Sequence, residues 1–114
     1  MLKPVYDDID MFRFEDLYIH SLSAPAGTEI LETCVGIAQM LIEKNISYGN
    51  SALEPSRIFS NASPIEQLKV RLDDKINRIK NGSSFIGDND IDDMIGYLVL
   101  LKIAKDKKWQ LYGW

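Results

Sequence analysis

Two carboxylates at the start of an apolar stretch are the residues best placed to do chemistry. The stretch runs from Asp90 to Ala104. At about 100° per residue, Asp90 and Asp93 share one helical stripe with Tyr97. Buried ionised carboxylates need a cation or another partner, so this stripe predicts a charged site. The alternative is that both residues belong to the first helical turn, where Asp side chains cap free N–H groups and complement the helix dipole.

Three helices are expected to position these carboxylates. The stretch 90–104 is apolar on every side, which is typical of a helix buried in a bundle or against a partner chain. A second helix is predicted over Glu29–Lys44, with Asn45 as a left-handed C-cap. The third begins with the capping box Ser63-Pro64-Ile65-Glu66 and ends at Lys80-Asn81-Gly82.

The third helix carries cations beside its apolar stripe. The stripe predicted to be buried consists of Ile65, Leu68, Leu72, Ile76 and Ile79. Arg71, Lys75 and Arg78 follow one border of it. These cations can bind phosphate through their charged ends, or they can shield the core with their alkyl stems. The sequence leaves both interpretations open.

The segment between the second and third helices lacks periodicity for longer than a plain connection requires. Tyr48, Leu53, Ile58 and Phe59 are large side chains that can anchor it as an ordered loop. Ordered loops commonly carry binding residues. Gly49, Asn50 and Ser51 offer turn geometry and hydrogen-bond donors, and Arg57 offers a guanidinium for phosphate or carboxylate.

Composition narrows the class of protein. The 114 residues predict one domain, and a net charge of −4 gives no general attraction to duplex nucleic acid or to an anionic membrane. No apolar run approaches the roughly 20 residues that cross a bilayer, and the acidic start does not resemble a signal peptide. Cys34 is the single cysteine, which favours a cytoplasmic protein without disulfides or a cysteine metal site. His20 lacks a second ligand or a nucleophile nearby in sequence, so it is interpreted as a surface or packing residue.

The predicted fold is an all-α bundle of three main helices in a single domain over 1–114. Residues 1–27 are expected to form a short helix or an irregular N-terminal wrap, residues 28–107 the helical core, and residues 108–114 an aromatic tail. A chain of this size with so apolar a central helix is expected to complete its core as a homo-oligomer.

Several short blocks resemble a known family. The blocks are Lys44-Asn45, Tyr48-Gly49-Asn50-Ser51, Arg71 to Ile79 and Asp92 to Tyr97, and together they span about Lys44 to Ala104. They resemble the "nucleotide modification associated" helical domains of phages and bacteria. More distantly, Asp90, Asp93, Met94, Ile95, Tyr97 and Leu98 are similar to a motif of the all-α MazG-type nucleotide pyrophosphohydrolases.

The MazG-like resemblance implies a metal-dependent reaction. In that superfamily an earlier helix adds a cluster of glutamates, and the acids together hold Mg²⁺ against the phosphates of a nucleotide. The resemblance thus implies Mg²⁺ on Asp90 and Asp93, because a hard cation neutralises phosphate charge and activates water.

This chain departs from the family pattern in the helix that should carry the glutamates. That helix has Arg71, Asp73, Asp74, Lys75 and Arg78, of which three are cations. Such a helix is suited to binding phosphate directly and poorly suited to a polyacidic metal centre. Glu29 and Glu32 supply the missing acids only if their helix packs with its polar face inward.

Three functions remain open from the sequence. The first is binding of a phosphate-bearing nucleotide, with hydrolysis to a monophosphate and pyrophosphate if Mg²⁺ is held. The second is a phage sponge that sequesters a nucleotide immune signal, such as a cyclic nucleotide or an ADP-ribose derivative. The third is a structural interaction module. The residues predicted to bind the ligand are Tyr48, Asn50, Ser51, Arg57, Phe59, Arg71, Asp74, Lys75, Arg78 and Tyr97.

Overall fold

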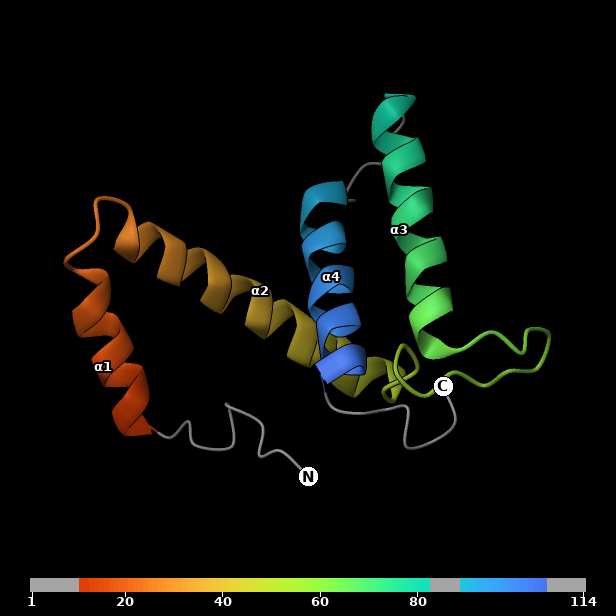
Figure 1. Cartoon of the computed structure of the whole chain (residues 1–114), viewed down its shortest axis with the longest axis horizontal. Helices are drawn as coiled ribbons and strands as arrows, with labels where there is room; N and C mark the ends of the chain where they lie inside the picture. The colour runs from red at the N-terminus through yellow and green to blue at the C-terminus, as the bar shows by residue number, and fades with distance from the viewer. Residues whose placement is uncertain (1–10, 83–88, 107–114) are drawn as a thin grey trace. The chain divides into compact units, whose positions relative to one another are not determined.

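The protein is all-α in the residues that its structure, a computed structural model, describes: 11–82 and 89–106. Four helices follow one another: α1 (Met11–Ser21), α2 (Gly27–Tyr48), α3 (Pro64–Lys80) and α4 (Asp90–Asp106) (Figure 1). No strand occurs in these two ranges. The all-α prediction is confirmed.

The chain divides into two compact units, Met1–Met40 and Leu41–Trp114, with the division inside α2. The first unit contains α1 and most of α2. The second contains the last turns of α2, the connecting loop, α3 and α4. The prediction of one domain stays a prediction, and the aromatic tail 108–114 lies outside the described residues.

Of the two alternatives for the N-terminal segment, the short helix is right and the irregular wrap is wrong for residues 11–21, which form the regular helix α1. The segment contains no glycine or proline to interrupt a helix. Its mixture of aromatic and acidic residues obscured this simple property. The helix count is therefore four in the described part of the chain.

A tight corner joins α1 to α2. Ser21 and Gly27 are both buried there, and the Gly27 N–H donates to the carbonyl of Ala24 at 3.1 Å. A Cβ atom at position 27 would lie 1.8 Å from the carbonyl oxygen of Ser21. The corner therefore needs a residue without a side chain at this position.

The second helix is longer than predicted at both ends. Asn45 is not its C-cap, because the helix continues through Tyr48. Gly49 then takes a left-handed conformation with φ 63°, and the Asn50 N–H donates to the Asn45 carbonyl at 3.2 Å. This bond closes a Schellman motif, in which glycine after the last helical residue is strongly favoured.

The start of α3 confirms the strongest local signal in the sequence. Ser63 is the N-cap, and its Oγ accepts a hydrogen bond from the Glu66 N–H at 3.1 Å. Pro64 follows at the first helical position, where its missing N–H costs nothing. The helix ends with Asn81 as C-cap and Gly82 at φ 68°.

The fourth helix begins at Asp90 as predicted and ends two residues later than expected. Asn89 caps it, since its Oδ1 accepts from the Asp92 N–H at 3.1 Å. The helix is not buried on every side within this chain, because Ile91 and Leu98 are exposed. Burial on every side within a bundle of this chain is therefore wrong, and burial against a partner chain stays a prediction.

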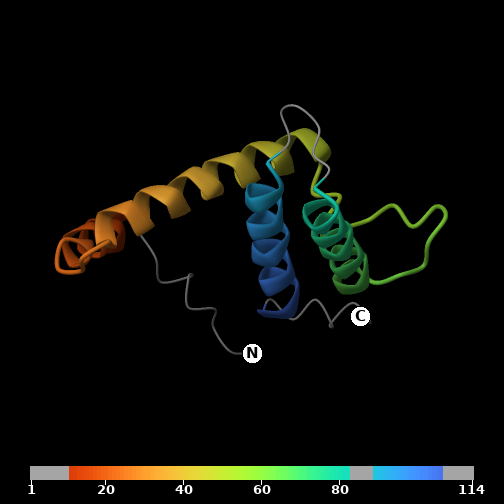
Figure 2. The same cartoon turned by 90° about the horizontal axis from the view of Figure 1, so that it is seen from above.

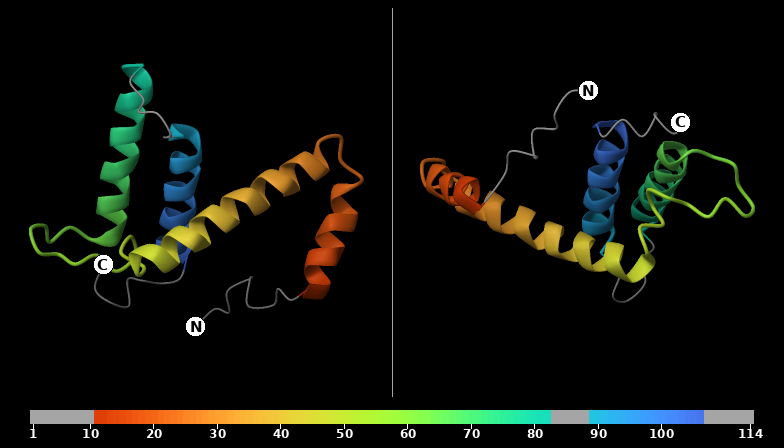
Figure 3. Two further views of the ribbon diagram at one scale, coloured as in Figure 1. Left: turned by 180° about the vertical axis from the view of Figure 1, so that it is seen from behind. Right: turned by 90° about the horizontal axis from the view of Figure 1, so that it is seen from below.

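α3 and α4 run antiparallel, side by side (Figures 1, 2 and 3). One end of their interface is a small apolar core of Leu53, Leu68 and Ala104, with Leu68 only 1% exposed. Ile65, Tyr97 and other half-buried residues pack against this core. Among the described residues, no helix has both the length and the apolar character that spanning a membrane requires.

Candidate functional site

The other end of the α3–α4 interface is charged. Lys75 lies on α3 and is only 8% exposed. Its Nζ is 2.9 Å from Asp93 Oδ2 and 3.4 Å from Asp90 Oδ1, both on α4. The two carboxylates singled out in the sequence therefore share one buried ammonium group.

Two further cations complete this arrangement. Arg78 Nε lies 3.8 Å from Asp90 Oδ1, and Lys44 Nζ, near the end of α2, lies 3.3 Å from Asp93 Oδ1. We call these five residues the ion-pair cluster: Lys44, Lys75, Arg78, Asp90 and Asp93. Three cations surround two carboxylates, so each carboxylate has more than one positive neighbour.

Arg71 continues the same row of pairs toward the apolar core. Its guanidinium carbon lies 5.8 Å from the centroid of the Tyr97 ring, a cation–π distance. Arg71, Lys75 and Arg78 on α3 thus face Tyr97, Asp93 and Asp90 on α4. The spacing is three or four residues on each helix, and the order is reversed, as an antiparallel pair requires.

The ion pairs shift the acid–base properties of two cluster members. Burial alone would raise the pKa of Asp93, but hydrogen bonds from Lys75 and Lys44 outweigh it and hold that pKa below the ordinary value. The hydrogen bond to Asp93 raises the pKa of Lys75 against the opposing effect of burial. Lys75 and Asp93 are therefore held as ions of opposite charge.

These residues do not fit a divalent cation well. An ammonium group already lies within 3.4 Å of both carboxylates that the MazG-like resemblance assigns to Mg²⁺. Within the described ranges, no group of three or more His, Cys, Asp or Glu side chains is placed to hold a metal. The assignment of Mg²⁺ to Asp90 and Asp93 stays a prediction, and no step proposed below passes through a metal.

A separate cleft of about 340 Å³ lies between the connecting loop and α3. Two arginines, three serines and exposed apolar side chains line it. The lining residues are Ser51, Pro55, Ser56, Arg57, Ile58, Phe59, Ser60, Gln67 and Arg71. We call it the arginine cleft, since its two charged lining residues are Arg57 and Arg71.

Specific contacts give the loop its course along the cleft. Gln67 on α3 donates through Nε2 to the carbonyl of Ala62 at 2.8 Å, and the Ala62 N–H donates to Ser60 Oγ at 3.1 Å. Arg57 has a positive φ of 57°, which is uncommon for a residue with a side chain. Backbone held in this region is found where the surrounding structure fixes it, often at binding sites.

The predicted binding residues separate into three groups. Ser51, Arg57, Phe59 and Arg71 line the arginine cleft. Lys75, Arg78, Asp90, Asp93 and Tyr97 lie in the α3–α4 interface. Tyr48 and Asp74 are exposed outside both, and Asn50 Oδ1 accepts from Asn45 Nδ2 at 2.8 Å.

The structure also adds residues that sequence reasoning missed. Gln67 and four loop residues, Pro55, Ser56, Ile58 and Ser60, line the cleft. Lys44 was not recognised as a partner of Asp93. The equal spacing of cations on α3 and acids on α4 was the signal for the ion pairs, whereas nothing local to the sequence indicates which loop residues face α3.

No family model, no curated protein and no solved structure matches this chain. The resemblance to the phage and MazG-type families therefore has no support beyond the sequence blocks themselves.

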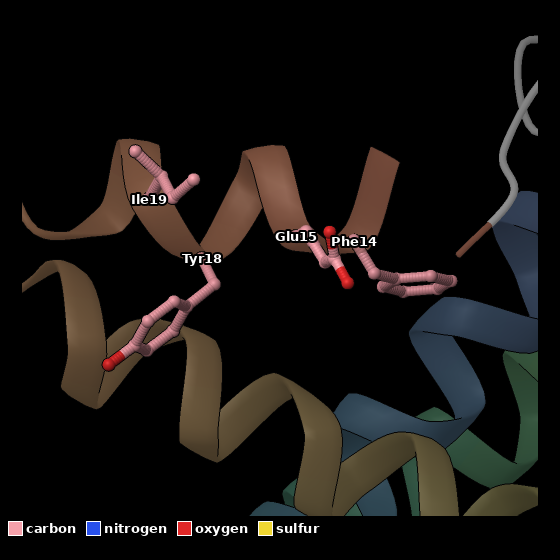
Figure 4. Close-up of a pocket in the computed structure, with 4 residues that line it drawn as sticks. All are labelled: Phe14, Glu15, Tyr18 and Ile19. Carbon is pink, nitrogen blue, oxygen red and sulfur yellow. The ribbon is translucent and has the colours of Figure 1, made fainter. Parts of the chain in front are cut away.

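A second pocket, of about 430 Å³, lies along α1 and offers different chemistry. Phe14, Glu15, Tyr18 and Ile19 line it, with Phe14 and Tyr18 one helical turn apart (Figure 4). Glu15 is its one charged lining residue, and it is an acid. This pocket therefore lacks the cations with which the arginine cleft can bind phosphate.

Proposed function

We propose that the arginine cleft binds a phosphate-bearing small molecule of the nucleotide type. The observation that carries the proposal is the pairing of Arg57 and Arg71 with an exposed aromatic side chain, Phe59, in one cleft. A guanidinium presents a planar fork of donors that matches phosphate oxygens. An aromatic ring offers a stacking surface that a nucleobase can cover.

The hydroxyl groups and the size of the cleft support the same ligand class. Ser51, Ser56 and Ser60 add three hydroxyls to the lining, and these can donate to phosphate or sugar oxygens. Small-molecule sites in proteins commonly have volumes of about 300–1,000 Å³. The volume of about 340 Å³ lies within that range and suits a single small ligand better than a polymer.

Phe59 is fully exposed, and this supports an interaction surface at the cleft. Exposing a large apolar ring to water is unfavourable, and covering it with a ligand recovers that free energy. Ile58 beside it is also exposed. The loop thus presents apolar groups next to a guanidinium, as a ligand with a flat base and a phosphate requires.

The proposal is for binding of the intact ligand. Asp90 and Asp93, the acids expected to hold Mg²⁺ for hydrolysis, have Lys75 between them. Arginines and hydroxyls grip phosphate without activating a water molecule. Sequestration of a nucleotide signal requires binding of the ligand but no hydrolysis of it. The identity of the signal is to be determined by experiment.

The test is direct binding measured by calorimetry against ATP, ADP-ribose, a cyclic dinucleotide and inorganic phosphate. Each titration is run with Mg²⁺ and with EDTA, and the ligand is recovered afterwards and analysed by chromatography. We expect one organic phosphate to bind without Mg²⁺ and to be recovered unchanged. Conversion of the ligand in the presence of Mg²⁺ would replace this proposal by hydrolysis.

Arg57→Gly is the sharpest variant, because glycine accepts the positive φ of this position while the guanidinium is removed. Loss of a charged hydrogen bond to phosphate should weaken binding roughly tenfold or more. Lys69→Ala is the matched control, since Lys69 is an exposed cation on α3 outside the cleft lining. Equal losses in the two variants, or no binding across the panel, would refute the assignment of this cleft.

A further inference from the structure

The helix α3 has an apolar row that does not face α4. Leu72, Ile76 and Ile79 each follow a residue of the interface, Arg71, Lys75 and Arg78 respectively, by one position. One position is a rotation of about 100°, so this row lies on one flank of the interface. Ile76 is 50% exposed, and Ile79 is exposed to a similar degree.

The helix α4 has a matching row. This row lies one position after the interface residues of α4: Ile91 follows Asp90, Met94 follows Asp93, and Leu98 follows Tyr97. Leu98 is 50% exposed, and Ile91 is more exposed still. This row is rotated from the interface in the same sense as the row on α3.

The two rows lie on the same side of the helix pair. In a right-handed helix the chain turns clockwise when it is viewed from its N-terminus. Seen from one end of an antiparallel pair, one helix therefore turns clockwise and the other counterclockwise. Equal rotations away from their shared interface thus lead to the same side of the pair. α3 and α4 are antiparallel (Figure 1). We call this surface the apolar hairpin face: Leu72, Ile76, Ile79, Ile91, Met94 and Leu98.

We propose that the apolar hairpin face packs against the same face of a second copy of this chain. A twofold contact places a surface against itself, so a surface with net charge at its centre would repel its own copy. The six residues of this face carry no charge. Its charged border residues are Lys69, Lys102 and Lys105, at the ends of the two rows, and two of them have carboxylate partners: Lys69 has Glu66 at 3.4 Å and Lys102 has Asp106 at 2.5 Å.

The size of the face also fits a second copy. Two 17-residue helices are each about 25 Å long and pack about 10 Å apart, giving a face of roughly 500 Å² in projection. Two such faces together contribute roughly 1,000 Å², which is about the total area that a specific protein–protein interface needs. Joining two hairpins adds a second layer to the small core of Leu53, Leu68 and Ala104 and produces a four-helix arrangement.

The experiment is the mass of the full-length chain by light scattering over a dilution series at micromolar concentrations. The unchanged chain should be a dimer. Ile76→Glu buries two carboxylates in the contact and should raise the dissociation constant roughly 100-fold. Val70→Glu is the matched control, because Val70 is 56% exposed on the same helix and, two positions after Leu68, points away from α4 and from this face.

A charge-exchange experiment separates a lost contact from a lost fold. One chain carries Ile76→Glu with Leu98→Glu, and the other carries Ile76→Lys with Leu98→Lys. Each alone should be folded by circular dichroism and monomeric by light scattering, and a mixture of the two should form a heterodimer. A monomeric unchanged chain would overturn the proposal, and so would dimers that survive Ile76→Glu and Leu98→Glu, since another surface, such as that of α1, would then hold the copies together.

Discussion

The two ends of the α3–α4 interface use opposite physics. At one end, Leu68 packs with Leu53 and Ala104 in an apolar core. At the other end, Lys75 is also buried, and the cost of burying its charge is offset by the carboxylates of Asp90 and Asp93. The apolar end gains free energy from every contact and accepts many arrangements of similar residues, whereas the charged end is tolerable only when each ion meets its partner.

This difference assigns different tasks to the two ends. Apolar packing supplies most of the stability, because removing carbon from water is favourable whatever the partner. Buried ion pairs often add little net stability, but a misaligned pair leaves charges unmatched. We therefore interpret the ion-pair cluster as the part that sets the register between α3 and α4.

The largest loss should follow Leu68→Ala. Leu68 is almost fully buried, and truncating a leucine in a core costs about 3 kcal/mol through lost burial and the remaining cavity. The free energy of unfolding is measured in urea at one protein concentration, because the stability of a dimer depends on concentration. Val70→Ala, on the exposed side of the same helix, should cost less than about 0.5 kcal/mol. Equal losses at both positions would mean that the apolar core is placed wrongly.

A smaller but still clear loss should follow Lys75→Met. Methionine keeps most of the volume and leaves two carboxylates facing each other, which should cost about 2 kcal/mol despite the remaining cations Lys44 and Arg78. Replacing Asp90 and Asp93 by leucine in the same chain should recover most of the loss, since no buried charge then lacks a partner. If the triple variant, with Lys75→Met and leucine at positions 90 and 93, were as unstable as Lys75→Met alone, this would contradict our interpretation. The ion pairs would then contribute to stability and not mainly to the register between α3 and α4.

The contribution of the Lys75–Asp93 pair should depend on pH at both extremes. The pKa of Asp93 is held below its ordinary 3.8, so its contribution is complete above that pH and is lost as the pH falls through the lowered value. The pKa of Lys75 is raised above 10.5, so its contribution is lost only as the pH rises through the raised value.

The difference in unfolding free energy between the unchanged chain and Asp93→Asn measures this dependence. This difference should be constant from about pH 5 to 9 and should become smaller at more acidic and at more basic pH. A difference that already falls between pH 5 and 7 would point to a titrating partner other than Lys75 and Lys44.

Arg78→Met should have the smallest effect. Arg78 Nε is 3.8 Å from Asp90, and the Arg78 side chain is more exposed than that of Lys75, so this ion pair contributes about 0.5 kcal/mol. Lys75 remains next to Asp90 in this variant. A loss comparable to that of Lys75→Met, in the same urea titration, would show that the charged end acts as one unit and not as a buried centre with a weaker edge.

Signals that act within one helical turn were readable from the sequence. Ser63 and Pro64 start α3 as predicted, because an N-cap needs only the next three residues. The end of α2 was misplaced, since Asn45 can end a helix but does not have to. The glycine at position 49 was the stronger stop signal, as left-handed backbone costs glycine little.

The buried face of α3 could not be chosen from α3 alone. Its apolar stripe predicted burial of Ile76, yet Lys75 is the more buried residue. Which face of α3 is buried depends on α4, because the carboxylates of α4 stabilise a cation at position 75. The same limit applies to the arginine cleft: Arg57 and Arg71 were each recognised as phosphate-binding types, while their meeting in one cleft depends on the course of the loop.

The corner before α2 has a consequence for how this sequence can vary. At position 27 the space for a side chain is taken by the backbone of Ser21, so even alanine would force the corner apart. At Gly36, in the middle of α2, an added Cβ atom would meet nothing within 4 Å beyond its chain neighbours and the backbone of its own helix, so alanine fits there. In a library of all single substitutions selected for folding, position 36 should accept alanine, whereas position 27 should retain only glycine.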